Sequence, residues 1–357
     1  MKLAVRVALL IGLALLAGLI AHEGAAILIP ITRAGWVLLW LVPLHAVPVL
    51  LDSRGWQVLI QRRVGAAVLF WIATVREAVD RLLPVANIGG ELVGIRLLAA
   101  TGVDGVTAAA SVTTELLVTL FSQYVFVLAG VTCLLSVTET ARSAGDELLA
   151  LGASLPVIVL LAVLLRHGSL FERLERLAVR TLGGETLRFL QGKWTALDAA
   201  IRELISSPER WCRTLLWQLS GLLARVGETW ITLRWLGHPL TVESALILES
   251  LTQAARNFVF VVPAGLGVQE AALVAVGRLL GVDGELALAL SLAKRMREIL
   301  FGTPALLSWY WTEGRKTGSP ATASNLAPLR VCLDGIRAKK LPPPVPGVGS
   351  GKPPHTG

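Results

Sequence analysis

The sequence predicts an all-α, polytopic integral membrane protein with about six full spans and two re-entrant hairpins of broken helices, arranged as an inverted repeat. Three observations predict this class. Of the 357 residues, 54% are hydrophobic and only 16% are charged, against about 25% charged residues in soluble domains. Apolar runs long enough to cross a bilayer recur along the chain. Two similar segments are interrupted by proline and glycine, as broken membrane helices are.

Six apolar runs are expected to cross the membrane, because about 20 apolar residues span the roughly 30 Å hydrocarbon core. The first run could instead be a cleaved signal peptide, but no good cleavage site precedes Gly24, so we favour a retained anchor. The six runs are approximately 3–21, 36–51, 106–137, 148–165, 211–236 and 285–311.

Two other apolar regions are too short or too interrupted to span the membrane as one helix. In the first, the apolar run 64–75 corresponds to about 18 Å of helix, and a second short run continues to residue 100. The second region covers 242–281. Each is predicted to be a hairpin of two helices joined by a break. The predicted breaks are at Pro84, Gly89, Gly90, Pro263, Gly265 and Gly267.

The remaining segments are expected to lie outside the bilayer. Residues 1–313 are predicted to form one membrane domain, with repeat halves at about 1–137 and 147–312. The connector 166–210 has leucines at helical spacing among arginines, which is typical of amphipathic helices on the cytoplasmic membrane surface. The tail 314–357 is rich in proline and glycine and is expected to be disordered.

Basic residues orient the predicted spans. If the N-terminus lies inside, the inward-facing segments carry twenty lysines and arginines, and the outward loops carry only Arg33 and Arg142. The positive-inside rule therefore predicts that both termini are cytoplasmic. The net charge of +8 is then explained by anionic lipid rather than by nucleic acid, which we do not expect as a partner.

The two hairpin regions align without gaps at an offset of 179 residues, with eight identities in the 27 positions from 84 to 110. The matches include Pro84 with Pro263, Glu91 with Glu270, and Gly-Val-Asp-Gly at 102–105 with the same residues at 281–284. Because three predicted spans separate the hairpins, the two halves must be inverted. Inverted repeats with paired broken helices are typical of alternating-access transporters, whose substrate site lies near the midplane.

Ionisable residues inside membrane segments are unfavourable, by about 2.5–3.5 kcal/mol each on insertion scales. Glu91 and Glu270 follow the breaks, and we expect them to line a central cavity as substrate-binding residues. The alternative is that each glutamate braces its own hairpin. Candidate partners or headgroup contacts are Arg76, Arg96 and Arg256, with Asn87 and Gln269 as neutral polar contacts.

Two further sets of charges lie within predicted spans. Arg225 and Glu228 are three residues apart and are expected to pair with each other. A cluster in the middle of the last span indicates either an aqueous cavity or an incorrect span boundary. That cluster is Lys294, Arg295, Arg297 and Glu298.

Chemistry-bearing residues are otherwise scattered. The three cysteines and five histidines show no metal-ligand spacing, and no zinc-protease, serine-hydrolase or P-loop motif occurs. We therefore expect no metal, no cofactor and no enzymatic activity. A membrane enzyme acting on a lipid headgroup would need a concentrated acid–base set.

Two segments resemble a known family. LLPVANIGGELVGIRLL at 82–98 resembles the LP…GE…R motif of the lysylphosphatidylglycerol synthase transmembrane-region family, and VVPAGLGVQEAALVAVGRLLGV at 261–282 resembles its P-x-G-L-G-x-x-E box. Together with AAASV at 108–112, the first segment is most similar to the hopanoid-biosynthesis-associated membrane subgroup (HpnL-like).

The resemblance implies a flippase-like protein of the inner membrane of a bacterium, with membrane lipids as cargo and a hopanoid or its polar derivative as the expected lipid. Lipid-biosynthesis proteins are a second class of expected partner. Larger family members also carry an aminoacyl-transferase domain, which we do not expect in this chain. The competing hypothesis is a non-catalytic scaffold for lipid-modifying enzymes.

Overall fold

The computed structural model describes residues 28–60, 64–83, 89–137, 196–197, 199–258 and 265–316. The predicted spans at 3–21 and 148–165, the connector up to 195 and the tail beyond 316 lie outside these ranges. Pro84, Asn87 and Pro263 lie outside them as well. The described residues up to Leu306 form one compact unit, and a second unit begins at Leu307.

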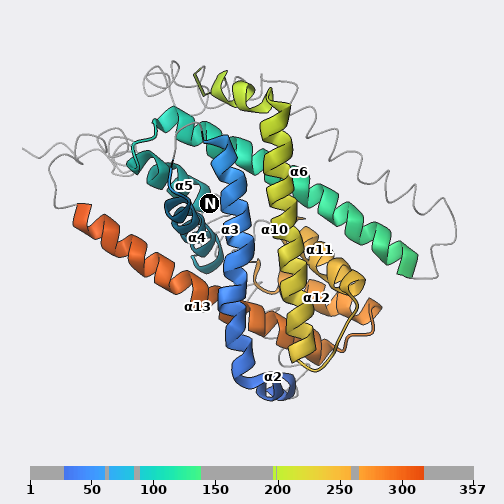
Figure 1. Cartoon of the computed structure of the whole chain (residues 1–357). Coiled ribbons are helices and arrows are strands. Elements are labelled where there is room, and N and C mark those ends of the chain that lie inside the picture. Colours follow the sequence, from blue (N-terminus) through green and yellow to red (C-terminus); the bar gives the residue numbers. More distant parts are fainter. Residues whose placement is uncertain are drawn as a thin grey trace, which may run out of the picture. The chain divides into compact units, whose positions relative to one another are not determined.

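All regular elements within the described residues are helices (Figure 1), so the prediction of an all-α fold is confirmed for them. In chain order they are α2 (Leu28–Ala34), the 3₁₀ helix η2 (Gly35–Trp40), α3 (Leu41–Leu59), α4 (Ala66–Leu82), α5 (Gly89–Ala100), α6 (Gly105–Val137), α10 (Pro208–Trp235), α11 (Val242–Phe258), α12 (Val268–Leu279) and α13 (Gly284–Lys316).

Helices α11, α12 and α13 have the same lengths, in the same order, as α4, α5 and α6. The first arms α4 and α11 have 17 residues each, and the second arms α5 and α12 have 12 each. The helices that follow them, α6 and α13, have 33 residues each. Each set of three therefore contains two short helices followed by one long helix, in the same order.

The duplicated Gly-Val-Asp-Gly sequence forms the turn before each long helix. Gly102 and Gly281 have positive φ angles of 91° and 74°, a conformation that glycine adopts without steric strain. Two residues later, the carbonyls of Asp104 and Asp283 accept the first helical hydrogen bonds, from Ala108 and from Ala287. The repeated sequence thus explains why α6 and α13 begin at equivalent positions.

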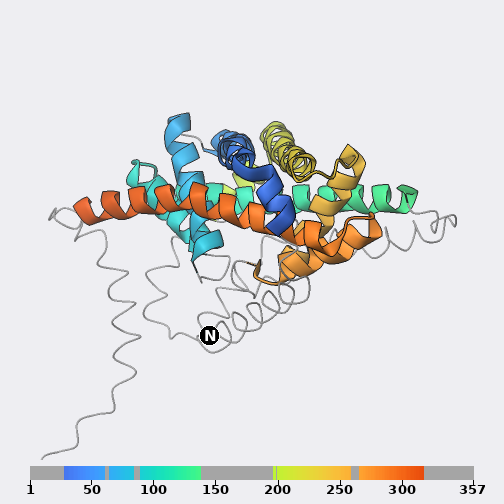
Figure 2. The same cartoon turned by 90° about the horizontal axis from the view of Figure 1, so that it is seen from below.

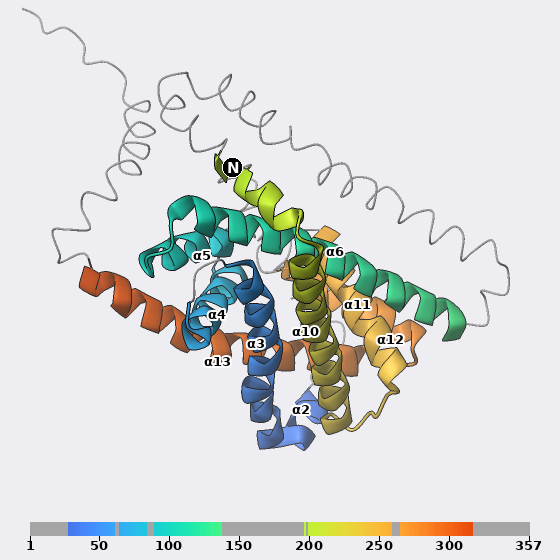
Figure 3. The same ribbon diagram turned by 45° about the horizontal axis from the view of Figure 1, so that its top comes forward.

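Helices α3 and α10 pack along each other (Figures 1 and 3), and small residues allow their close approach. A Cβ atom added at Gly55 of α3 would lie 3.2 Å from Trp217 Cβ of α10. Thr214 Oγ1 of α10 donates a hydrogen bond to the carbonyl of Gly55 at 3.3 Å. Figure 2, in which α3 and α10 are seen close to end-on, shows α6 running across them.

The hairpin arms pack against each other and against a long helix of the other set. Helix α4 contacts α5, and α11 contacts α12 and α6. Gly302 of α13 lies against Ala78 of α4, where a glycine Cβ would be 3.1 Å from Ala78 Cβ. Each first arm, α4 or α11, therefore contacts the long helix of the other set.

Two described helical stretches, 28–59 and 105–136, are long and apolar enough to cross a membrane by length and composition. Helices α10 and α13 are longer than the roughly 30 Å hydrocarbon core requires, but they carry several ionised side chains. In α13 the helix continues through Lys294, Arg297 and Glu298, which are buried within the protein. The polar cluster therefore does not end the helix.

The predicted end of the second span at residue 51 is wrong for the helix, because α3 continues to Leu59. The polar residues Asp52, Ser53 and Arg54 suggested an end. Instead, Asp52 pairs with Arg225 of α10 at 2.6 Å, and the Ser53 hydroxyl donates to the carbonyl of Leu50 at 2.8 Å. Both side chains have partners inside the protein, Asp52 through Oδ2 only, so the helix need not end there.

Candidate functional site

A cavity of about 500 Å³ lies among α3, α4, α5, α6, α10 and α11, within the size range of small-ligand sites. Its lining is strongly ionic. Five carboxylates line it, from Asp52, Glu77, Asp80, Glu91 and Glu115. Four guanidiniums line it, from Arg76, Arg81, Arg225 and Arg256. The first arms of both hairpins, α4 and α11, contribute to this lining.

Arg76 joins three helices at one side of the cavity. From α4 it donates to Glu91 Oε2 of α5 at 2.5 Å and to Glu115 Oε2 of α6 at 2.6 Å. Its guanidinium carbon also lies 4.7 Å from the centroid of the Trp56 ring, a cation–π geometry. Its side chain passes directly over Gly94 of α5, where a Cβ would collide with it. Arg76 therefore holds both hairpin arms and α6 together.

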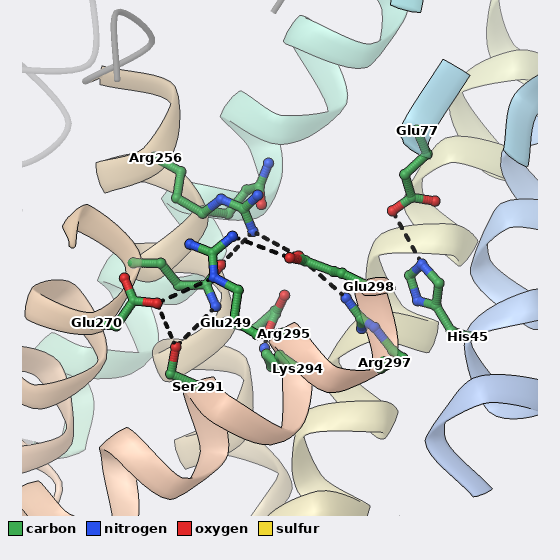
Figure 4. A network of polar contacts seen from close by, with 12 residues as sticks. His45, Glu77, Glu249, Arg256, Glu270, Ser291, Lys294, Arg295, Arg297 and Glu298 are labelled. Carbon is green, nitrogen blue, oxygen red and sulfur yellow. Dashed lines mark hydrogen bonds and ion pairs between the residues drawn. The ribbon is translucent and has the colours of Figure 1, made fainter. Parts of the chain in front are cut away.

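Arg256 occupies a comparable position in the second hairpin. From α11, its Nη1 donates to Gln269 Oε1 in the first turn of α12 at 2.8 Å, and the same nitrogen lies 3.9 Å from Glu298 Oε1 of α13. Like Arg76, it connects its own hairpin arm to the second arm and to the long helix that follows. Figure 4 shows Arg256 extending toward Glu298.

Glu270 is not among the residues that line the cavity. It is 2% exposed and accepts hydrogen bonds from Ser291 Oγ at 3.0 Å and Arg295 Nε at 3.3 Å, both on α13 (Figure 4). Gln269 is 1% exposed and donates to Ser291 Oγ at 3.3 Å. In the described residues, Glu270 therefore joins α12 to α13, and it is Gln269 that contacts the other hairpin arm, through Arg256.

The candidate substrate residues are therefore divided. Arg76, Glu91 and Arg256 line the cavity, whereas Gln269, Glu270 and Arg96 are not among its lining residues. Asn87 lies outside the described residues.

The candidate break residues are placed as follows. Gly89 and Gly90 lie in the first turn of α5, where the Gly90 N–H donates to Asp80 Oδ1 at 2.8 Å. Gly265 and Gly267 lie between α11 and α12 with φ angles of 59° and 75°.

The prediction that Arg225 and Glu228 pair with each other is wrong. Arg225 pairs with Asp52 of α3 at 2.6 Å, and Glu228 pairs with Arg297 of α13. Helical spacing identifies neighbours on one helix, but Arg225 and Glu228 each pair with a residue on an adjacent helix.

Sequence reasoning did not identify His45 as part of a site. Its Nε2 lies 3.1 Å from Glu77 Oε1 of α4, and its Nδ1 lies 3.1 Å from Glu228 Oε2 of α10. These partners are 32 and 183 residues away, so no local pattern indicates them. The signal in the sequence was an ionisable residue inside an apolar run. Such a residue in a membrane segment is by default a candidate functional residue.

Ion pairs continue from His45 into α13. Glu228 accepts from Arg297, Arg297 Nη2 lies 3.6 Å from Glu298 Oε1, and Arg295 Nη1 donates to Glu298 Oε2 at 3.2 Å. Nearby, Lys294 pairs with Glu249 of α11, which also accepts from Thr229 Oγ1 at 2.6 Å. Figure 4 shows Lys294, Arg295, Arg297 and Glu298 of this network, together with the His45–Glu77 contact.

Comparisons with known proteins identify the family. No curated protein and no solved structure matches the chain. The model of the lysylphosphatidylglycerol synthase TM region matches residues 3–305, which is most of the chain. The chain therefore belongs to the lysylphosphatidylglycerol synthase transmembrane-region family and is a membrane protein.

Proposed function

We propose that this protein moves a lipid with a polar headgroup between the two leaflets of a membrane. The observation that carries the proposal is the cavity of about 500 Å³ whose ionic lining includes residues from both hairpins. Ionised groups in a membrane protein persist where they face protein, water or a polar substrate. A lipid headgroup in this cavity would meet such groups while its tails remained in the bilayer.

The proposed mechanism is alternating access by two inverted halves. The matching helix lengths, the offset of 179 residues and the comparable contacts of Arg76 and Arg256 support a repeat. In each half, the arginine connects a hairpin to the long helix that follows. A hairpin would then move together with its long helix and open the cavity to one leaflet at a time.

The cavity suits a headgroup that carries charge. The Glu91 side chain is 21% exposed, and Glu91 and Arg256 line the same cavity. Gln123, Gln253 and Asn257 add neutral hydrogen-bonding groups to the wall. Such a lining can bind cationic, anionic and hydroxyl groups of a headgroup together.

The cargo and the setting are proposed from the sequence. The similarity of LLPVANIGGE and AAASV to the hopanoid-associated subgroup makes a hopanoid or its polar derivative the first lipid to test. We place the protein in the inner membrane of a bacterium, with about six spans and both termini in the cytoplasm. Lipid-biosynthesis proteins would then be its partners.

A leaflet-exchange assay tests the proposal. Purified protein is placed in liposomes that contain a labelled phospholipid or a labelled hopanoid, and transfer is compared for the wild type and for Glu91→Gln with Arg256→Gln. Arg213→Gln is a matched control, because the Arg213 side chain is 62% exposed on α10 and lies outside the cavity lining.

We expect wild-type and Arg213→Gln protein to exchange at least one lipid, and the cavity variant to lose that exchange. Folded wild-type protein that exchanges neither lipid would contradict the proposal and favour the scaffold hypothesis. Equal exchange by the cavity variant would place the lipid pathway elsewhere.

A further inference from the structure

His45 lies between two carboxylates from different helices, and the geometry requires a proton. Glu77 and Glu228 each lie 3.1 Å from a different ring nitrogen, and the side-chain exposures of Glu77, His45 and Glu228 are 18%, 3% and 2%. A carboxylate only accepts hydrogen bonds, and a neutral imidazole has a single N–H donor. Both contacts are hydrogen bonds only if the imidazole is doubly protonated or one carboxyl carries a proton.

The charges around His45 come from four helices. Arg297 of α13 pairs with Glu228 and opposes a positive ring, whereas Glu77 and Glu228 favour it. Asp52 of α3 and Arg225 of α10 form a pair beside Glu77, and Arg81 of α4 is also close enough to act on Glu77. Phe301 of α13 covers the ring edge-on, with centroids 5.1 Å apart.

A proton on His45 also balances the connected network. Within the described residues, ion pairs join four carboxylates to three permanent cations through His45. The carboxylates are Glu77, Glu228, Glu270 and Glu298, and the cations are Arg256, Arg295 and Arg297. One proton makes this set neutral, and a buried set with unbalanced charge is strongly unfavourable.

This network begins and ends at the cavity. Glu77 of the first hairpin lines the cavity at one end, and Arg256 of the second hairpin lines it at the other. Between them the contacts pass through His45, Glu228 and α13. Gaining or losing a proton at His45 therefore changes the ion pairs that connect the two hairpins.

We infer that the Glu77–His45–Glu228 triad is a proton-binding site that couples lipid movement to a proton gradient. This inference rests on the proposed lipid transport. The proton enters from cavity water at Glu77, resides on the His45 ring, and returns to water through Glu77 when the cavity faces the other side. No other reactant is consumed.

Coupling predicts an unequal lipid distribution. If one proton moves with each lipid, a gradient of about one pH unit can enrich the lipid in one leaflet up to about tenfold. The test uses vesicles of phosphatidylethanolamine and phosphatidylglycerol with fluorescent phosphatidylglycerol or a fluorescent hopanoid. An impermeant quencher then reports the leaflet distribution with the gradient in either direction and with no gradient.

Wild-type protein should produce an enrichment that reverses with the gradient. His45→Gln should lose this asymmetry, because an amide cannot carry the proton. His238→Gln, changed in the turn after α10 and outside the network, should keep it. If wild-type protein exchanges the lipid but leaves it equally distributed between the leaflets under every gradient, the inference is overturned and lipid transport stands. Absence of any exchange by folded wild type would remove the basis of both proposals.

A second measurement keeps His45 in place and so does not depend on whether His45→Gln folds. The other four histidines are replaced by glutamine, and ¹⁵N NMR reports the protonation of both His45 nitrogens. We expect a ring with both nitrogens protonated that loses one proton as the pH rises. A ring with one protonated nitrogen that stays unchanged between about pH 5 and pH 8 would overturn the inference.

Discussion

Asn257 of α11 donates a hydrogen bond to Gln123 Oε1 of α6 across 2.7 Å, and both residues line the cavity. Gln253, one turn earlier on α11, donates to Asn257 Oδ1 at 3.3 Å. The contact joins the second hairpin to the first half of the chain without any charge. It therefore crosses the boundary that must rearrange if the two halves move relative to each other.

Asn257→Ala is expected to slow lipid exchange and to change the unfolding free energy little. The hydrogen bond contributes about 0.5–1.5 kcal/mol, and Asn257 is exposed, so water can replace its partner. Exchange rate and denaturant unfolding in detergent are compared for Asn257→Ala, Gln123→Ala and the double variant. If the two residues act as a pair, the double variant is no slower than the slower single variant. Additive slowing would show that they act separately.

Arg76→Ala is expected to destabilise the protein by about 3–5 kcal/mol, because it leaves the carboxylates of Glu91 and Glu115 without their cation. Glu115→Gln in the same chain should recover part of this loss by removing one uncompensated charge. The measurement is chemical unfolding in detergent. Arg213→Ala, on an exposed pair, should change stability by less than about 1 kcal/mol. A small effect of Arg76→Ala would contradict its role in joining α4, α5 and α6.

A disulfide between α4 and α13 is expected to stop lipid exchange reversibly. Cβ atoms at positions 78 and 302 would lie 3.1 Å apart, so a separation of the helices by a few tenths of an ångström would reach the roughly 3.5–4.5 Å found in disulfides. Ala78→Cys and Gly302→Cys are combined in a chain whose native cysteines are replaced by serine. Oxidation should abolish exchange and reduction should restore it, because the bond fixes the first hairpin to the other half. Full exchange by the oxidised protein would show that this contact does not open.

Gly90→Ala is expected to destabilise the first hairpin. An added Cβ would lie 2.6 Å from the carbonyl oxygen of Arg76 and would also collide with the Asp80 side chain. Gly227→Ala is the matched control, because it lies within α10 with nothing within 4 Å of the added atom. That control should gain up to about 1 kcal/mol of stability from helix propensity. Thermal unfolding in detergent distinguishes the two, and equal effects would contradict the close packing at Gly90.

Much of the fold and part of the candidate site could be predicted from patterns of neighbouring residues in the sequence. Gly265 and Gly267 lie between α11 and α12, and the repeated Gly-Val-Asp-Gly marked where α6 and α13 begin. Charges within apolar segments pointed to Arg76, Glu91 and Arg256, which do line the cavity. Each of these predictions depends on residues close together in sequence or on an internal duplication.

The partners of buried charges could not be predicted in this way. Arg225 and Glu228 are adjacent on one helix, yet each pairs across to a different helix. Glu91 and Glu270 occupy equivalent positions, but Glu91 meets Arg76 of α4 whereas Glu270 meets Ser291 and α13. A sequence repeat conserves where helices begin and break, but it does not specify which side chains face each other after packing.

The buried ion pairs between halves also have a consequence for biosynthesis. Asp52 is made long before its partner Arg225, and His45 long before Glu228. Until α10 has been synthesised, the first half carries these polar groups without the partners that later neutralise them, a state that lipid disfavours. We therefore expect the first half to complete its insertion only when the second half arrives. The two halves, expressed as separate chains, should each be degraded when made alone and persist when made together.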